Sequence, residues 1–183
     1  MSKKGIIVAG GAAAAAAPEA VDFDGDNDYL SKTSDLTSNA DGKTFTFSAW
    51  VYITEVGTGY GKNHVLISNT GDQALFFRVW TSGSSELYHL RLNAHSPAGS
   101  RILRWLGESN SSYIPLKTWT HILVSCNMGN ASNRYVYIND VNAGGTFGTY
   151  TNSTINFTDT IHYIGGGVGS SDKFGGRLTH VYL

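Results

Sequence analysis

Polar and apolar residues alternate strictly along residues 44–53, Thr-Phe-Thr-Phe-Ser-Ala-Trp-Val-Tyr-Ile. Successive side chains of a β-strand point to opposite faces, so one face of this stretch carries only Phe, Ala, Val and Ile. The other face carries hydroxyl groups together with Trp50 and Tyr52, whose rings are apolar but bear a polar atom. The pattern predicts a central strand whose apolar face packs against a second sheet and whose other face is partly covered.

Comparable stretches recur along the rest of the chain, separated by turn sequences such as Asn69-Thr-Gly-Asp72. Two short strands around an acidic turn are expected within residues 19–31. Many short strands with turn signals between them predict an all-β protein, an antiparallel two-sheet β-sandwich or jelly roll. The further strands are expected at residues 64–69, 74–81, 86–93, 101–106, 118–126, 134–139, 160–164 and 174–183.

Composition supports this fold class. The 183 residues include 22 Gly, 10 Tyr and only 3 Pro, a balance that favours strands and tight turns. Only Glu19, Glu55, Glu86 and Glu108 are glutamates, which leaves little material for surface helices. The length suits one domain with a terminal appendage.

Charge and hydropathy limit the expected partners, and the single cysteine indicates a structural thiol. The formal net charge is −1 and the sequence has no basic patch, so nucleic acid is not an expected partner. No apolar run reaches the roughly 18 residues that a membrane span needs. The single cysteine, Cys126, alternates with Ile122 and Val124, which predicts a buried structural thiol.

Residues 1–18 differ from everything after them, with two lysines, then Ile-Ile-Val-Ala-Gly-Gly, six alanines and Pro18. We expect an N-terminal arm, anchored in an assembly, followed by a domain at 19–183. A poorly hydrophobic secretion signal and a disordered leader are the alternatives.

The order of several short motifs resembles the laminin-G-like jelly roll of the concanavalin A-like lectin/glucanase superfamily. They include Phe-Thr-Phe-Ser-Ala-Trp-Val, Trp119-Thr-His-Ile and Tyr135-Val-Tyr-Ile-Asn-Asp140, and the resemblance covers residues 20–183. Asp140 stands where the family's hairpin usually has Gly, a change that a type I′ turn tolerates. The chain also stops inside a strand that the family usually continues, which suggests a longer natural polypeptide and a truncated domain. The Ala/Gly-rich leader resembles those of structural proteins of tailed phages and prophages.

The glucanase branch of this superfamily uses Glu-x-Asp-x-Glu, because an acid and a nucleophile must lie about 5 Å apart. No such motif is present, and the chain is predicted not to be an enzyme. The six histidines form no His-x-x-x-His pair and no zinc site is expected.

The acidic turn invites a calcium site, with Asp24, Asp26 and Asp28 as candidate ligands. The spacing excludes an EF-hand, because Gly and Glu are missing from the required positions. The favoured interpretation is that these side chains cap the turn, so the expected cofactor is either none or Ca²⁺.

A sugar site needs exposed aromatic rings beside polar side chains. Tyr60 in a Gly-rich loop, Trp105 near Asn110, and Tyr113 are the candidate glycan-binding residues. The alternative for Trp105, within Arg-Ile-Leu-Arg-Trp-Leu, is a place in the core.

Two functions follow. The first is a non-enzymatic structural component of a phage particle, whose arm docks to other virion proteins or to copies of itself and whose lectin-like jelly roll faces outward. Such a protein would be assembled in the host cytoplasm. The alternative is a free carbohydrate-binding or adhesion module, secreted or at a cell surface and assisted by calcium, with a cell-surface glycan as partner.

Overall fold

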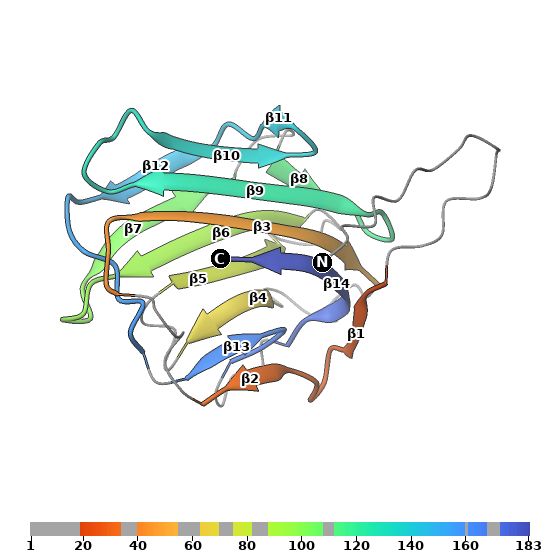
Figure 1. Cartoon of the computed structure of the whole chain (residues 1–183). Helices are drawn as coiled ribbons and strands as arrows, with labels where there is room; N and C mark the ends of the chain where they lie inside the picture. Colours follow the sequence, from red (N-terminus) through yellow and green to blue (C-terminus); the bar gives the residue numbers. More distant parts are fainter. Residues whose placement is uncertain are drawn as a thin grey trace, which may run out of the picture.

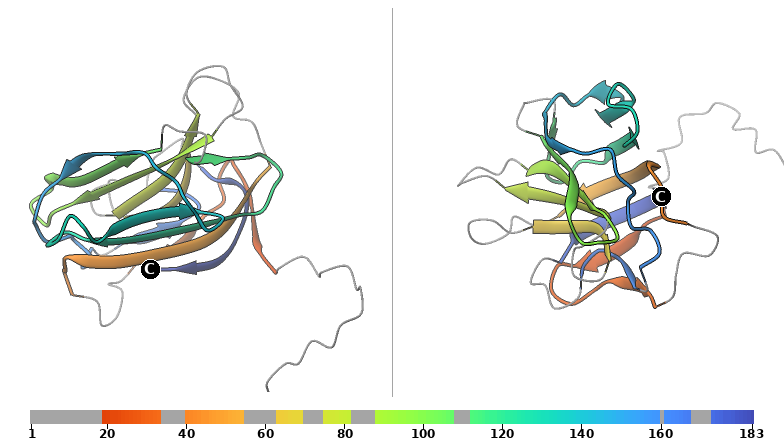
Figure 2. Two further views of the ribbon diagram at one scale, coloured as in Figure 1. Left: turned by 90° about the horizontal axis from the view of Figure 1, so that it is seen from above. Right: turned by 90° about the vertical axis from the view of Figure 1, so that its left-hand side faces the viewer.

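A computed structural model shows two antiparallel β-sheets stacked face to face (Figures 1 and 2). It describes residues 19–33, 40–54, 63–69, 75–81, 88–107, 112–159, 161–167 and 173–183. These residues contain no α-helix, so none of their segments is a helix long and apolar enough to cross a membrane. The predicted fold class, an antiparallel two-sheet β-sandwich, is confirmed.

The first sheet has six strands. Their order across the sheet is β1 (Val21–Asp24), β14 (Gly175–Tyr182), β3 (Thr44–Ile53), β9 (Thr120–Asn127), β10 (Arg134–Ile138) and β11 (Val141–Asn142).

The second sheet has eight strands. Seven follow the order β12 (Thr146–Tyr150), β7 (Arg101–Leu106), β6 (Tyr88–His95), β5 (Leu75–Thr81), β4 (Asn63–Asn69), β13 (His162–Ile164) and β2 (Leu30–Lys32), and β8 (Tyr113–Ile114) pairs with β6.

The core lies between the sheets and contains the apolar face of β3, as the alternation predicts. Burying a large apolar side chain contributes roughly 1.5–3 kcal/mol, so this row alone anchors the sandwich. Leu90, Leu92 and Trp105 of the second sheet are also fully buried in this core. The buried residues of β3 are Phe45, Phe47, Ala49, Val51 and Ile53.

The predicted strands agree with the observed ones to within two residues at either end wherever both are described. Cys126 is buried beside Ile122 and Val124, as expected. Three short strands, β8, β11 and β12, were not predicted. β8 and β11 have only two residues each, too few for an alternating pattern. In β12 the two aromatic residues, Phe147 and Tyr150, are three positions apart across an irregularity of the register, so the alternation is broken.

The hairpin between β10 and β11 has the predicted turn. Ile138 pairs with Val141, leaving Asn139 and Asp140 as a two-residue loop. Their φ angles are 49° and 63°, and two central residues with positive φ define a type I′ turn. Asp140 is therefore accommodated where related domains usually have Gly.

β14 contains a bulge. Thr179 lies opposite Trp50 and Tyr182 lies opposite Ser48, so β14 uses one more residue than β3 over this interval. His180, with φ of 50°, is the residue that absorbs the irregularity. The bulge leaves the Val181 side chain directed between the sheets and the exposed Tyr182 on the outer side.

Candidate functional site

The outer face of the six-stranded sheet is rich in aromatic rings. Strand alternation turns these side chains away from the core, and the cross-strand register brings several of them together. We call this surface the outer aromatic face. It consists of Trp50, Tyr52, Trp119, His121, Tyr135, Tyr137 and Tyr182.

At its centre, Trp50 of β3 lies opposite His121 of β9. The two rings are stacked with centroids 5.1 Å apart and planes inclined by 28°. Ser48 Oγ and His121 Nε2 are hydrogen-bonded at 3.0 Å, which fixes the orientation of the imidazole. Trp50 is 40% exposed, so its indole is available to a ligand.

On the part of the face nearest β1, the Tyr52 ring lies beside one aromatic and one charged side chain. Its centroid is 5.4 Å from that of Trp119, and the Arg177 guanidinium lies 5.8 Å from the Tyr52 centroid. Arg177 Nε is 3.3 Å from a carboxylate oxygen of Asp22. This end of the face is therefore aromatic with a paired, exposed cation and anion.

Towards the other end of β3, the face is hollowed. A shallow polar groove of about 500 Å³ borders Tyr135, which is 43% exposed and lies 6.4 Å from the Tyr137 ring in a stacked arrangement. Its lining offers hydroxyl and amide groups as donors and acceptors beside an aromatic ring. Sugars have apolar ring faces and many hydroxyls, so this combination suits them. The polar lining residues are Thr44, Thr46, Ser125, Asn127 and Asn133.

The outer face of the eight-stranded sheet carries several arginines, unlike the outer aromatic face. Arg91, Asn93 and His95 alternate on this face of β6, and in the register Arg104 lies opposite Asn93 and Arg101 opposite His95. Burial, and secondarily the positive charge of Arg101, lower the pKa of His95. Cations this close favour an anionic ligand over a neutral sugar.

For Trp105, one of the three predicted glycan-binding residues, the prediction is wrong. Its side chain is fully buried, and the indole Nε1 donates a hydrogen bond of 3.1 Å to the Gly144 carbonyl. The alternative place for Trp105, in the core, is confirmed. Tyr60 lies outside the described residues. Tyr113 is half-buried, its ring edge-to-face with His89 at 4.5 Å, and its role stays a prediction.

The acidic turn is capped as the favoured interpretation expected. One carboxylate oxygen of Asp24 accepts hydrogen bonds from the backbone N–H groups of Asp26, Asn27 and Asp28, at 2.8–3.3 Å. These bonds, from Asp26 and Asn27 first, lower the pKa of Asp24. Among the described residues, no three His, Cys, Asp or Glu side chains converge as a metal site. Calcium binding at Asp24, Asp26 and Asp28 stays a prediction.

Sequence patterns did not predict the outer aromatic face, because its residues come from several separate stretches of the chain. Alternation already placed Trp50 and Tyr52 outward, but only the register shows that His121 and Trp119 lie beside them. The alternation of Tyr135 and Tyr137 within residues 134–139 was the one available signal for the far end of the face.

Two antiparallel sheets stacked face to face define the class of protein, an all-β jelly roll. Residues 24–183 match the family described as the concanavalin A-like lectin/glucanases superfamily (Laminin_G_3). The chain belongs to this family, which confirms the resemblance seen in its motifs. No curated protein sequence matches it.

Two solved structures share the fold. One is that of domains LG4–5 of the mouse laminin alpha1 chain, with a TM-score of 0.57 and 13% identity. The match covers 88% of this chain and 40% of the laminin chain. The other is a Bacteroides ovatus protein whose suggested role is carbohydrate binding, with a TM-score of 0.57 and 14% identity. That match covers 85% of this chain and 41% of the other.

Proposed function

We propose that this domain binds carbohydrate without chemical turnover, through the outer aromatic face. The observation that carries the proposal is the exposed Tyr135 ring beside a polar groove on the same sheet face as Trp50. Family membership and the suggested role of the Bacteroides ovatus protein support it.

Two aromatic platforms at different heights on the sheet favour an extended saccharide over a single sugar. Thr46, beside the groove, and Trp50 are four residues apart on β3, which is roughly 14 Å along a strand. A chain of sugar units could contact both platforms, stacking on the rings and exchanging hydrogen bonds with the groove. The rings are held by β-strands, so little side-chain entropy is lost on binding.

The test is a glycan array followed by titration calorimetry with any saccharide that binds. We expect Tyr135→Ala and Trp50→Ala each to weaken binding about tenfold, equivalent to about 1.4 kcal/mol. Tyr29→Ala is the matched control, because Tyr29 is 48% exposed but its ring packs against Tyr163 of the eight-stranded sheet. Reducing-end assays on the same saccharides should detect no cleavage.

Absence of binding to any glycan would refute the proposal, as would wild-type affinity in both variants. Arrays run with calcium and with a chelator test the predicted assistance by calcium. Selective loss with the chelator would support the site at Asp24, Asp26 and Asp28.

The role as a phage-particle component stays a second hypothesis. Its support is the resemblance of the Ala/Gly-rich leader to phage structural proteins, and residues 1–18 lie outside the described part of the chain. Localisation, in a virion or at a cell surface, is likewise a prediction. Co-purification of the full chain with particles would support the virion hypothesis.

A further inference from the structure

The outer face of the eight-stranded sheet carries a cluster of positive charge that lies apart from the outer aromatic face. The strands β6, β7 and β12 contain no Asp or Glu, so no carboxylate of these strands neutralises their arginines. We call this surface the arginine face. It consists of Arg91, Asn93 and His95 of β6, Arg101 and Arg104 of β7, Tyr113 of β8 and Thr149 of β12.

Arg104 lies at the centre of a polar row across three strands. Asn93 of β6 lies opposite it on one side, and Thr149 of β12 lies opposite it on the other. Side chains directly opposite each other in an antiparallel pair have Cβ atoms about 5 Å apart. The register of β12 skips Gly148, and this irregularity places the hydroxyl of Thr149, rather than a glycine, beside Arg104. A guanidinium, an amide and a hydroxyl therefore lie side by side.

Three buried polar atoms at neighbouring positions of this face have no hydrogen-bond partner among the residues that the structure describes. They are Nε of Arg104, Oδ1 of Asn93 and Nδ1 of His95. Buried polar atoms without a partner are rare in folded proteins, because each has lost its hydrogen bonds to water. Since the three residues share one face of β6 and β7, a single ligand can supply the partners.

The chemistry of these atoms specifies the ligand. The Nε–H group of an arginine and one of its terminal N–H groups form a fork that binds a carboxylate through two parallel hydrogen bonds. The Asn93 amide presents either its oxygen or its nitrogen, and a hydroxyl group is a partner for both. A ligand that has a carboxylate beside hydroxyls therefore pairs with Arg104 and Asn93 together. A neutral sugar leaves the guanidinium without a counter-ion, and a simple anion leaves the amide without a partner.

An aromatic ring lies farther along the same face. Tyr113 is opposite His89, and their rings are edge-to-face with centroids 4.5 Å apart. His89 and Asn93 are four residues apart on β6, which is roughly 14 Å along a strand. One sugar bound at Arg104 does not reach Tyr113, whereas a short chain of sugars does. The charge of Arg91 lies between the two positions.

We propose that the arginine face binds acidic oligosaccharides. A uronic acid unit places its carboxylate on Arg104 and its hydroxyls on Asn93 and Thr149, and a further unit packs against the ring of Tyr113. This site does not depend on the outer aromatic face, because the two surfaces belong to different sheets.

NMR of the ¹⁵N-labelled full chain tests the proposal, because the Nε–H signal of Arg104 reports on the proposed contact directly. The ligands are D-galacturonate and its linear trimer. We expect both to shift the Arg104 signal, and the trimer to bind about tenfold more tightly because it reaches Tyr113. D-Galactose has no carboxylate, and acetate and inorganic sulfate have no sugar hydroxyls. Each of these three should bind about tenfold more weakly than galacturonate.

Substitutions locate the two contacts. Arg104→Lys keeps the positive charge but removes the fork, and should weaken galacturonate binding about tenfold. Arg177→Lys is the matched control, because Arg177 lies on the other sheet and pairs with Asp22. Tyr113→Ala should remove the advantage of the trimer and leave the affinity for the monosaccharide unchanged.

A second variant covers the case in which circular dichroism shows that Arg104→Lys is unfolded. Asn93→Asp places a carboxylate opposite Arg104, where it pairs with the guanidinium and should abolish galacturonate binding. Tyr135→Ala should bind galacturonate with wild-type affinity. Failure of this proposal is thereby distinguished from failure of the outer aromatic face.

An Arg104 signal that galacturonate does not shift would overturn the proposal. So would wild-type affinity in folded Arg104→Lys or Asn93→Asp. Equal affinities for galacturonate and for galactose, acetate or sulfate would overturn it, because the carboxylate and the hydroxyls would then not act together. Equal affinities for the trimer and the monosaccharide would overturn the assignment of an oligosaccharide.

Discussion

Gly176 offers a sharp test of how β14 is held in the sandwich. Its φ of 145° lies in a region that L-residues rarely adopt. A Cβ atom at this position would lie 2.1 Å from the Tyr52 carbonyl oxygen and 3.0 Å from the Ile53 Cα. Both are backbone atoms of the neighbouring β3, so no side chain can move aside to relieve the contact. Gly176→Ala must therefore displace β14 from β3.

The cost follows from two contributions. A residue held in an unfavourable backbone region costs of order 1–3 kcal/mol, and overpacking that forces a backbone shift costs typically 1–3 kcal/mol more. We expect Gly176→Ala to lower the free energy of unfolding by about 2–6 kcal/mol, which is a large share of the 5–15 kcal/mol typical of a domain.

Urea denaturation followed by tryptophan fluorescence measures this loss, as a lower midpoint at an unchanged slope. Gly148→Ala is the matched control, because Gly148 lies in β12, has no positive φ, and would place its Cβ with nothing within 4 Å. It should change stability by less than about 1 kcal/mol. Equal midpoints for the two variants would refute the reasoning about Gly176.

Two further predictions concern titratable groups. Burial raises the pKa of Cys126 to about 12. The thiol should therefore not react with alkylating reagents at about pH 9 in the folded protein, but should react fully in urea. Rapid labelling of the folded protein would contradict this prediction. Backbone N–H donors hold the pKa of Asp24 below its ordinary value of 3.8. The ionised carboxylate therefore stabilises the folded protein above pH 3.8, and this stabilisation is lost as the pH falls through the folded-state pKa. Asp24→Asn should therefore make the urea midpoint depend less on pH in the acid range. Asp140→Asn, in the exposed turn after β10, is the control. If the midpoint of Asp24→Asn depends on pH as the wild type does, the capping role is contradicted.

The sequence predicted the fold well where the pattern is local. The alternation at residues 44–53 identified the central strand with its observed bounds, because one fully apolar face leaves a single register that buries it. The type I′ turn at Asn139 and Asp140 was likewise readable from two adjacent residues. The bulge at His180 was not, because it depends on how β14 fits against β3 rather than on any turn residue.

The candidate site was predicted less well, for a physical reason. Whether an aromatic residue is exposed depends on the layer that packs against it. Alternation within residues 44–53 places Trp50 on the polar face of its strand, whereas two adjacent apolar residues interrupt the alternation in Arg-Ile-Leu-Arg-Trp-Leu and leave the face of Trp105 open. Trp105 alternates inward on β7 and lies against Gly145, where a Cβ atom would be 2.6 Å from the indole. Trp50 points outward and is 40% exposed, and no strand of the described residues packs over it. Only the three-dimensional structure settles the position of Trp105.

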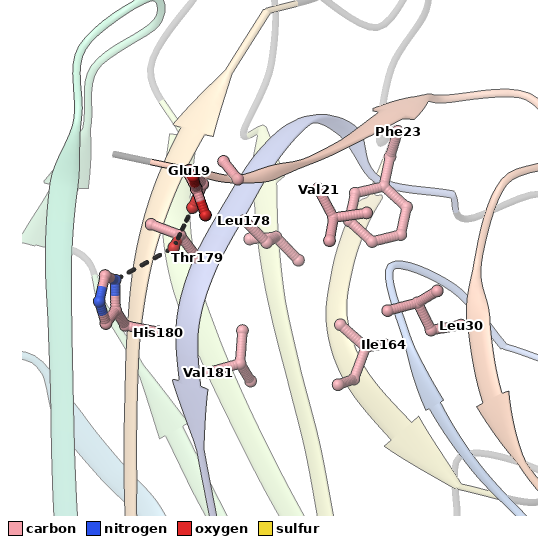
Figure 3. Close-up of a pocket in the computed structure, with 10 residues that line it drawn as sticks. Glu19, Val21, Phe23, Leu30, Ile164, Leu178, Thr179, His180 and Val181 are labelled. Atoms are coloured by element: carbon pink, nitrogen blue, oxygen red, sulfur yellow. Dashed lines mark hydrogen bonds between the residues drawn. The ribbon is translucent and has the colours of Figure 1, made fainter. Parts of the chain in front are cut away.

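β14 contributes side chains to two surfaces, the outer aromatic face and an apolar groove between β1 and β14 of one sheet and β2 and β13 of the other (Figure 3). Arg177 and Tyr182 point to the outer aromatic face, whereas Leu178 and Val181 line the groove. Alternate residues of a strand face opposite sides, and the bulge at His180 shifts the alternation by one residue, so that Leu178 and Val181 share a side. The groove and the outer aromatic face therefore lie on opposite sides of β14, and a change in one leaves the rings of the other in place. Leu30→Asp, which places a charge in this groove, should therefore leave glycan affinity intact, whereas Tyr135→Ala weakens it; a loss of affinity in Leu30→Asp would contradict the assignment of the site to the outer aromatic face.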